Sequence, residues 1–224
     1  MAINTSCYKK IKGVVFDLDG TLLNTLPDIA LAANKALEKF GYPVHLESTI
    51  KKFLGNGSRV LIKKAMPEDK QIYEFIEPVL EYYLKKYKNL EQEKTKPYDG
   101  ILNLLEELKK RNIKTAIVTN KNDFLAEKCV SKFIPQSCFN SVIGQNDNYP
   151  AKPHRYMADK AVSDINEKNE DCVFVGDSYV DIKTGLNAGI RTIGVTWGFG
   201  QKKELVDSGA WKIIDHPMDL IKIL

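Results

Sequence analysis

The feature that most constrains this chain is a short apolar run that stops abruptly at acidic residues. Residues 13 to 16 read Gly-Val-Val-Phe, and Asp17-Leu18-Asp19-Gly20-Thr21 follows directly. A β-branched apolar segment of this length predicts a buried strand of a parallel sheet that ends in a polar loop. Two carboxylates, two residues apart, are therefore expected at the carboxyl end of that strand.

The same arrangement recurs three times along the chain. Apolar segments that end in polar or glycine-containing loops occur at 114–118, 172–175 and 192–195. Stretches with helical periodicity lie between them, at 101–111, 124–133, 155–165 and 180–188. Alternating strands and helices predict an α/β fold with a doubly wound parallel sheet, a Rossmann-like core.

Residues 24–96 follow a different pattern, with helical periodicity and turn signals but no convincing pair of strands. Helices are expected over 27–40, around 59–65 and over 71–90, and Pro97 marks the return to the alternating pattern. We therefore predict a small α-helical cap at 24–96, inserted into a core made of 1–23 and 97–224.

Polar side chains end three of the predicted strands, and a lysine lies in a proline-flanked loop. The residues are Asp17 and Asp19, Thr119, Asp177 and Asp181, and Lys152. Ligands of open parallel sheets bind at the carboxyl ends of the strands, so we expect these side chains to converge on one crevice.

These residue types in this order predict phosphoryl transfer. A phosphate that faces several carboxylates needs charge compensation, which implies a hard divalent cation, Mg²⁺, with Lys152 adding further positive charge. Asp17 is expected to attack phosphorus and form an aspartyl-phosphate. Asp19 would protonate the leaving group and later activate water. Thr119 would donate a hydrogen bond to a phosphoryl oxygen.

Four segments resemble the motifs of the haloacid dehalogenase superfamily of phosphohydrolases. D-x-D-G-T matches 17–21, the strand-end threonine matches Thr119, the motif lysine matches Lys152, and G-D-S/T-x-x-D matches 176–181. The resemblance spans roughly residues 11 to 200. The inserted segment is similar to the helical cap of the phosphoglycolate phosphatase and β-phosphoglucomutase branch.

The resemblance implies a different role for each of the acidic residues at the metal site. Asp17 and Asp177 would ligate Mg²⁺ by carboxylate and Asp19 by its backbone carbonyl. Asp181 would lie outside these ligands and help to orient them. Residues 54–59 and 195–198 look like phosphoglycolate phosphatases in particular. The expected substrate-binding residues are therefore Thr119, Asn120, Lys152, Gly55, Asn56 and Arg59. The planar guanidinium of Arg59 could hold a substrate carboxylate.

Other functions remain open at this point. A phosphomutase or a sugar-phosphate phosphatase would share the core motifs, and a signalling receiver domain or a binding protein without turnover would share the fold. The formal charge of +4 comes from dispersed lysines, which predicts a mild preference for anionic ligands and no nucleic-acid partner. The motifs predict a small phosphorylated metabolite as the partner. No apolar run has the length of a membrane span, so we expect a cytoplasmic protein. We further expect a monomer or a homodimer.

Overall fold

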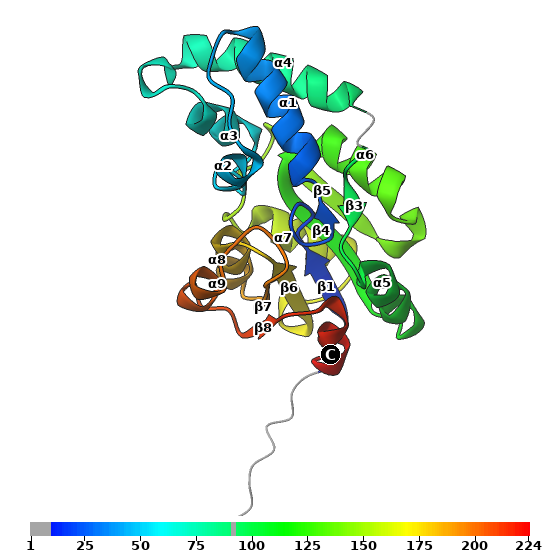
Figure 1. Cartoon of the computed structure of the whole chain (residues 1–224). Coiled ribbons are helices and arrows are strands. Elements are labelled where there is room, and N and C mark those ends of the chain that lie inside the picture. Colours follow the sequence, from blue (N-terminus) through cyan, green and yellow to red (C-terminus); the bar gives the residue numbers. More distant parts are fainter. Residues whose placement is uncertain (1–9, 91–92) are drawn as a thin grey trace, which may run out of the picture.

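The computed structural model describes residues 10–90 and 93–224, and its centre is a parallel sheet (Figure 1). The sheet has six strands in the order β5-β4-β1-β6-β7-β8. Their bounds are β1 Gly13–Phe16, β4 Lys114–Asn122, β5 Ser141–Gln145, β6 Cys172–Gly176, β7 Arg191–Val195 and β8 Lys212–Ile214. All five pairings between neighbours are parallel, which confirms the predicted α/β class.

Helices cover both faces of this sheet. They are α5 Ile101–Lys110, α6 Asp123–Phe133, α7 Tyr156–Asp164, α8 Tyr179–Ala188 and α9 Lys202–Asp207. Side chains of β1 alternate between two buried clusters: Val14 and Phe16 belong to the cluster with α5 and α6, and Val15 belongs to the cluster with α7. Both faces of the strand are buried, which explains the uninterrupted apolar run in the sequence.

The segment between the first two sheet strands is helical. It contains α1 Leu26–Lys39, α2 Glu47–Lys51, α3 Ser58–Ala65 and α4 Tyr73–Asn89. Short 3₁₀ helices lie here and elsewhere at Glu68–Lys70, Gln136–Cys138, Asn169–Asp171 and Pro217–Lys222. We refer to α1–α4 as the cap helices; in Figure 1 they lie together at the top of the molecule.

A two-stranded ribbon joins the cap helices to the sheet. Strand β2, Leu23–Asn24, pairs antiparallel with β3, Lys96–Pro97. Just beyond the ribbon, the buried Asp28 carboxylate accepts hydrogen bonds from the backbone N–H and the hydroxyl of Thr95, at 2.7 and 2.6 Å. The ribbon spans the predicted limits of 24 and 96, and the domain limits themselves stay a prediction.

Some elements differ from the sequence-based expectation. Strand β4 does not end before Thr119 but continues to Asn122, with an irregular register against β5 after Val118. Strands β5 and β8 and helices α2 and α9 were not predicted.

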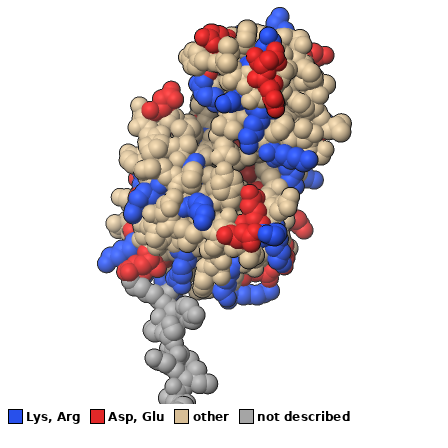
Figure 2. Space-filling model, turned by 90° about the vertical axis from the view of Figure 1, so that its left-hand side faces the viewer, with Lys and Arg blue, Asp and Glu red and all other residues tan. Residues whose placement is uncertain are grey.

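The surface and the helix lengths bear on two further expectations. On the face shown in Figure 2, Lys and Arg side chains are interspersed with acidic ones, in agreement with the dispersed lysines of the sequence. Within residues 10–90 and 93–224, no helix is both long and apolar enough to cross a membrane.

Candidate active site

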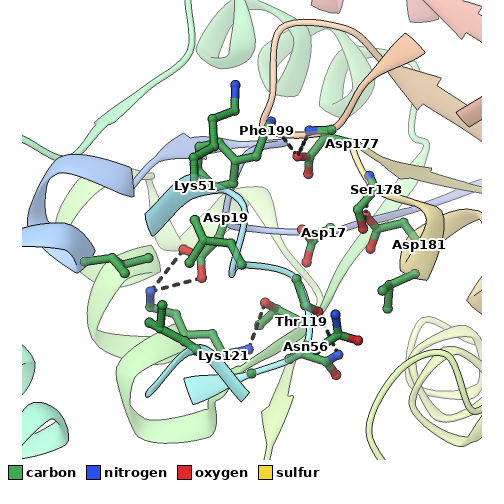
Figure 3. Close-up of a pocket in the computed structure, with 18 of the residues that line it drawn as sticks. Asp17, Asp19, Lys51, Asn56, Thr119, Lys121, Asp177, Ser178, Asp181 and Phe199 are labelled. Atoms are coloured by element: carbon green, nitrogen blue, oxygen red, sulfur yellow. Dashed lines mark hydrogen bonds and ion pairs between the residues drawn. The ribbon is translucent and has the colours of Figure 1, made fainter. Parts of the chain in front are cut away.

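A cavity of about 610 Å³ lies between the carboxyl ends of the sheet strands and the cap helices. Figure 3 shows the predicted acidic residues around it, Asp17 and Asp19 from the loop after β1 and Asp177 and Asp181 from the segment after β6. Its lining includes the core residues Asp17, Asp19, Thr119, Asn120, Lys121, Lys152, Asp177 and Asp181, and the cap residues Ser48, Lys51, Lys52, Gly55, Asn56, Ser58 and Lys64. The structure thus brings together every predicted site residue except Arg59.

The loop after β1, which carries Asp17 and Asp19, forms a tight turn. The Leu18 carbonyl accepts hydrogen bonds from the N–H groups of Leu22 and Leu23, both at 3.0 Å. Gly20 lies in this turn at φ +94°, and a Cβ atom there would lie 2.5 Å from the Asp177 carboxylate. Glycine is therefore required both by the backbone conformation and by the close approach.

Asp177, which follows β6, is held in place by its neighbours. Its Oδ1 accepts a hydrogen bond from the Thr21 hydroxyl at 3.0 Å, and its Oδ2 accepts one from the Phe199 N–H at 2.7 Å. Gly198 and Gly200 allow this loop to approach, since a Cβ at either position would lie 2.4 Å or less from Asp177. The geometry of this wall therefore depends on three glycines, Gly20, Gly198 and Gly200, that pack against Asp177.

Lys152 lies at the centre of the buried charges. Its ammonium donates hydrogen bonds to Asp17 Oδ1 at 2.7 Å, to Asp181 Oδ1 at 2.6 Å and to the Val118 carbonyl at 3.0 Å. The other Asp181 oxygen accepts hydrogen bonds from the N–H and the hydroxyl of Ser178. All three ammonium donors of Lys152 are therefore satisfied, and Asp181 is fixed from two sides.

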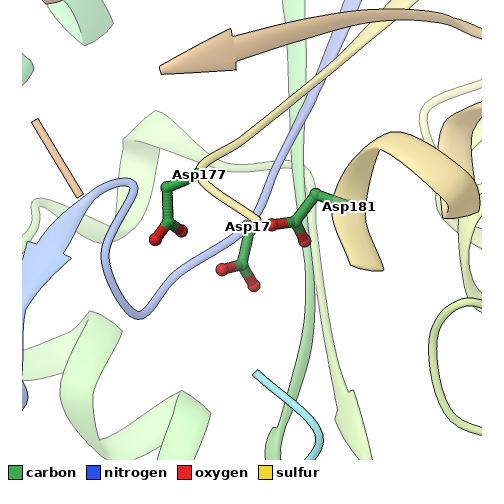
Figure 4. Close-up of side chains that lie close together, drawn as sticks. All are labelled: Asp17, Asp177 and Asp181. Carbon is green, nitrogen blue, oxygen red and sulfur yellow. The ribbon is translucent and has the colours of Figure 1, made fainter. Parts of the chain in front are cut away.

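The carboxylates of Asp17, Asp177 and Asp181 form an acidic cluster that fits a metal site (Figure 4). Each offers an oxygen within 4.8 Å of the others, and all three residues are buried. Burial raises the pKa of Asp17 to about 8, against the opposing effect of Lys152, and the other two carboxylates raise it further. Burial and Asp181 raise the pKa of Asp177 to about 7. Lys152 alone thus cannot balance all three carboxylates in their ionised forms, whereas a hard divalent cation with oxygen ligands would do so.

Asp19 points away from this cluster, toward a lysine that the sequence analysis did not single out. Its carboxylate accepts a hydrogen bond from the Thr25 hydroxyl at 2.7 Å. Lys121 donates to both Asp19 oxygens, at 3.0 and 3.1 Å, and to the Tyr87 hydroxyl oxygen at 3.0 Å. The sequence signal was the lysine two residues after Thr119, but its burial depends on a tyrosine of the cap.

Thr119 and Asn120 occupy the continuation of β4. Thr119 is buried, and its hydroxyl accepts a hydrogen bond from the Lys121 N–H at 3.2 Å. The Asn120 amide accepts from the Lys152 N–H and donates to two carbonyls, those of Lys152 and Gly55. In this structure Asn120 therefore ties the lysine loop and the cap loop to the sheet.

The cap residues divide into two groups. Gly55 and Asn56 line the cavity, and Asn56 accepts a hydrogen bond from the Tyr179 hydroxyl at 3.4 Å. Arg59 instead forms an ion pair with Glu77 of α4 and is absent from the cavity lining. The carboxylate-binding role predicted for Arg59 therefore has no support in this geometry, whereas Lys51, Lys52 and Lys64 supply cationic groups on the cap wall.

Comparison with known proteins identifies the family of this chain. Residues 14–195 match the model of the haloacid dehalogenase-like hydrolase family. The chain is 30% identical to a phosphoglycolate phosphatase of Aquifex aeolicus, covering 94% of this chain and 95% of the relative, and 31% identical to one of Vibrio cholerae, covering 96% and 98%. A crystal structure of a predicted phosphoglycolate phosphatase from Haemophilus somnus superimposes with a TM-score of 0.88 at 27% identity, covering 95% of this chain and 97% of that one. This chain belongs to the haloacid dehalogenase-like hydrolases.

Proposed function

We propose that this protein is a Mg²⁺-dependent phosphatase that hydrolyses a small acidic phosphate monoester, with 2-phosphoglycolate as the leading candidate. Its membership among the phosphohydrolases of this family makes it a phosphoric monoester hydrolase. The observation that carries the proposal is the meeting of Asp17, Asp19, Thr119, Lys152 and Asp177 in one cavity from four different segments.

Asp17 is the proposed nucleophile. Its carboxylate lies 2.7 Å from the ammonium of Lys152, whose positive charge would also attract the phosphoryl group. Thr119 would donate its hydroxyl hydrogen to a phosphoryl oxygen, because its hydroxyl oxygen already accepts from a backbone N–H. Attack by Asp17 forms the acyl phosphate and releases the leaving-group oxygen, which takes a proton from Asp19. Asp19 then accepts a proton from the water that cleaves the acyl phosphate.

The acidic cluster supports Mg²⁺ as the cofactor. Asp17 and Asp177 would bind it by their carboxylates and Asp19 by its backbone carbonyl, while Asp181 stays engaged with Lys152 and Ser178. When bound, the cation supplies charge compensation for the phosphoryl group. The Thr21 hydroxyl and the Phe199 N–H orient Asp177 for this role.

The cap wall supports an acidic leaving group. Lys51, Lys52 and Lys64 line the part of the cavity that belongs to the cap helices. A substrate carboxylate would be attracted there by charge. Relatives named phosphoglycolate phosphatase agree with this choice, and a sugar-phosphate phosphatase or a phosphomutase is the alternative.

The test is a comparison of kcat/KM for 2-phosphoglycolate and β-glucose 1-phosphate, with Mg²⁺ and with a chelator. We expect preference for 2-phosphoglycolate, loss of activity in chelator and recovery on adding Mg²⁺. Glucose 6-phosphate as the product from β-glucose 1-phosphate would establish a mutase instead, and unchanged rates in chelator would refute the cation. A cytoplasmic location and a monomeric or homodimeric state stay predictions.

A further inference from the structure

Two lysines are buried in the described part of the chain, Lys121 and Lys152, and each contacts one of the two carboxylates of the first loop. Lys152 pairs with Asp17, and its role follows from the proposed reaction. Lys121 pairs with Asp19, and the reaction as proposed so far leaves it without a role. Burying an ammonium group is costly unless hydrogen bonds and a counter-charge compensate, so this placement calls for an explanation.

The contacts of Lys121 fix the orientation of the Asp19 carboxylate. The ammonium lies 3.0 and 3.1 Å from the two carboxylate oxygens, and the Thr25 hydroxyl lies 2.7 Å from one of them. The carboxylate is thus held on one side by Lys121 and on another by Thr25. Its side chain still keeps 20% of its surface exposed, toward the cavity, so one face remains open to a substrate.

Tyr87 in turn fixes Lys121. This tyrosine belongs to cap helix α4 and is fully buried. Its hydroxyl oxygen accepts a hydrogen bond from Lys121 at 3.0 Å, and the ammonium lies 4.5 Å from the centre of its ring. The lysine therefore has a hydrogen bond and a cation–π contact from the cap as well as an ion pair from the core.

We propose that Lys121 is a positioning residue for the acid/base Asp19, and that Tyr87 of the cap holds Lys121 in place. The inference rests on the proposed function, because it assigns a task to Asp19 in that reaction. Lys121 itself transfers no proton in this scheme. It sets the direction in which Asp19 presents its oxygen to the leaving group and to the attacking water.

A leaving-group comparison separates positioning from substrate binding. The glycolate leaving group needs a proton as the ester bond breaks, whereas p-nitrophenolate leaves readily without one. Impaired positioning of the acid should therefore slow cleavage of 2-phosphoglycolate far more than the first step with p-nitrophenyl phosphate. Loss of a substrate-binding or structural group would not produce this difference.

The experiment compares Lys121→Met with the parent protein in single-turnover cleavage of both substrates. We expect a 10- to 100-fold lower rate with 2-phosphoglycolate, since general acid catalysis contributes about 10²–10⁴-fold, and a change below about threefold in the rate of p-nitrophenolate release. Both rates come from one sample, so a fraction of misfolded protein cancels in their ratio. Lys121→Arg should restore part of the ratio, and Tyr87→Phe should shift it in the same direction as Lys121→Met by a smaller factor.

Two further lysine variants serve as controls for the ratio of the two rates. Lys152→Met should slow both substrates together, and Lys110→Met, at an exposed lysine of α5, should leave the ratio unchanged. An equal loss on both substrates, or a rise in KM with kcat preserved, in Lys121→Met would overturn the inference. A parent protein that releases phosphate from neither substrate would refute the proposed function itself, which is a distinct result.

Discussion

The two walls of the cavity are built differently. On the sheet side, Asp177 accepts hydrogen bonds from Thr21 and Phe199. Lys152 donates hydrogen bonds to Asp17, to Asp181 and to the Val118 carbonyl. On the cap side, the loop near Gly55 is joined to the sheet side by hydrogen bonds of 3.0 to 3.4 Å, through Asn120, Lys51 and Tyr179. The bonds on the sheet side are 2.6 to 3.0 Å long and two of them join opposite charges, whereas none of the three on the cap side joins opposite charges. We therefore expect the chemistry to depend on the sheet wall and the choice of substrate to depend on the cap wall.

Among substitutions on the sheet side, we expect the largest loss of activity for Asp17→Asn. The amide cannot act as the anionic nucleophile, and it weakens the proposed cation site, so we expect kcat to fall on the order of 10⁴-fold or more. Phosphate release from 2-phosphoglycolate with excess Mg²⁺ measures this loss. Activity within tenfold of the parent would remove Asp17 from the role.

A smaller loss is expected for Lys152→Ala on the same wall. Removing one preorganised charged donor costs on the order of 2 to 4 kcal/mol of transition-state stabilisation, or about 30- to 1000-fold in kcat/KM. Thermal unfolding of the variant serves as the control for its fold. A change below tenfold would mean that Lys152 only neutralises Asp17 and Asp181.

The raised pKa values of Asp17 and Asp177 predict how stability depends on pH. Without a cation, the folded state keeps protons on these groups up to about pH 8 and 7, whereas the unfolded chain releases them near pH 4. The folded state thus binds more protons in this window, so its free energy of unfolding falls as pH rises from about 4 to 8.

Thermal unfolding in chelator tests that dependence. We expect Tm to fall by several degrees between about pH 5 and 8, since about 1 kcal/mol shifts Tm by roughly 2–4 °C at this chain length. Mg²⁺ should raise Tm more at the higher pH, because it replaces the released protons. Asp177→Asn should flatten the profile, and a metal-free profile that is flat in the parent protein would contradict the charge imbalance.

The smallest effect is expected on the cap wall, at Arg59. Its guanidinium is paired with Glu77 and more than half exposed, so Arg59→Ala should change kcat/KM for 2-phosphoglycolate by less than about twofold. Lys51→Ala is the matched cap variant, and losing the positive charge that we propose attracts the substrate carboxylate should cost about tenfold, mostly in KM. If the two effects are reversed, the cap closes in a way that brings Arg59 into the cavity.

Sequence reasoning succeeded where local pattern and burial coincide. The run at 13–16 is apolar because both of its faces are covered, and the strand-end residues converge because parallel strands end at the same edge of the sheet. Strand β5, Ser141–Gln145, was missed because its sequence lacks both alternation and a continuous apolar run.

The site residues that were missed depend on contacts distant in sequence. Lys121 resembles any surface lysine until Tyr87, which is 34 residues earlier, covers it. Gly198 was noted as part of a pattern, but its function of admitting Asp177 at close range is visible only in three dimensions. The exclusion of Arg59 from the cavity likewise depends on Glu77 of a neighbouring helix.

The ribbon of β2 and β3 has a consequence for how such a chain can change. Leu23 is paired with Pro97 and Asn24 with Lys96, so the polypeptide leaves the sheet layer and re-enters it at neighbouring points. Antiparallel neighbours can be joined by a turn of two residues. The path of the remaining chain is thus almost the same whether the segment between β2 and β3 is long or short. The helices in this segment can therefore be lengthened, shortened or exchanged without changing the order of the strands in the sheet.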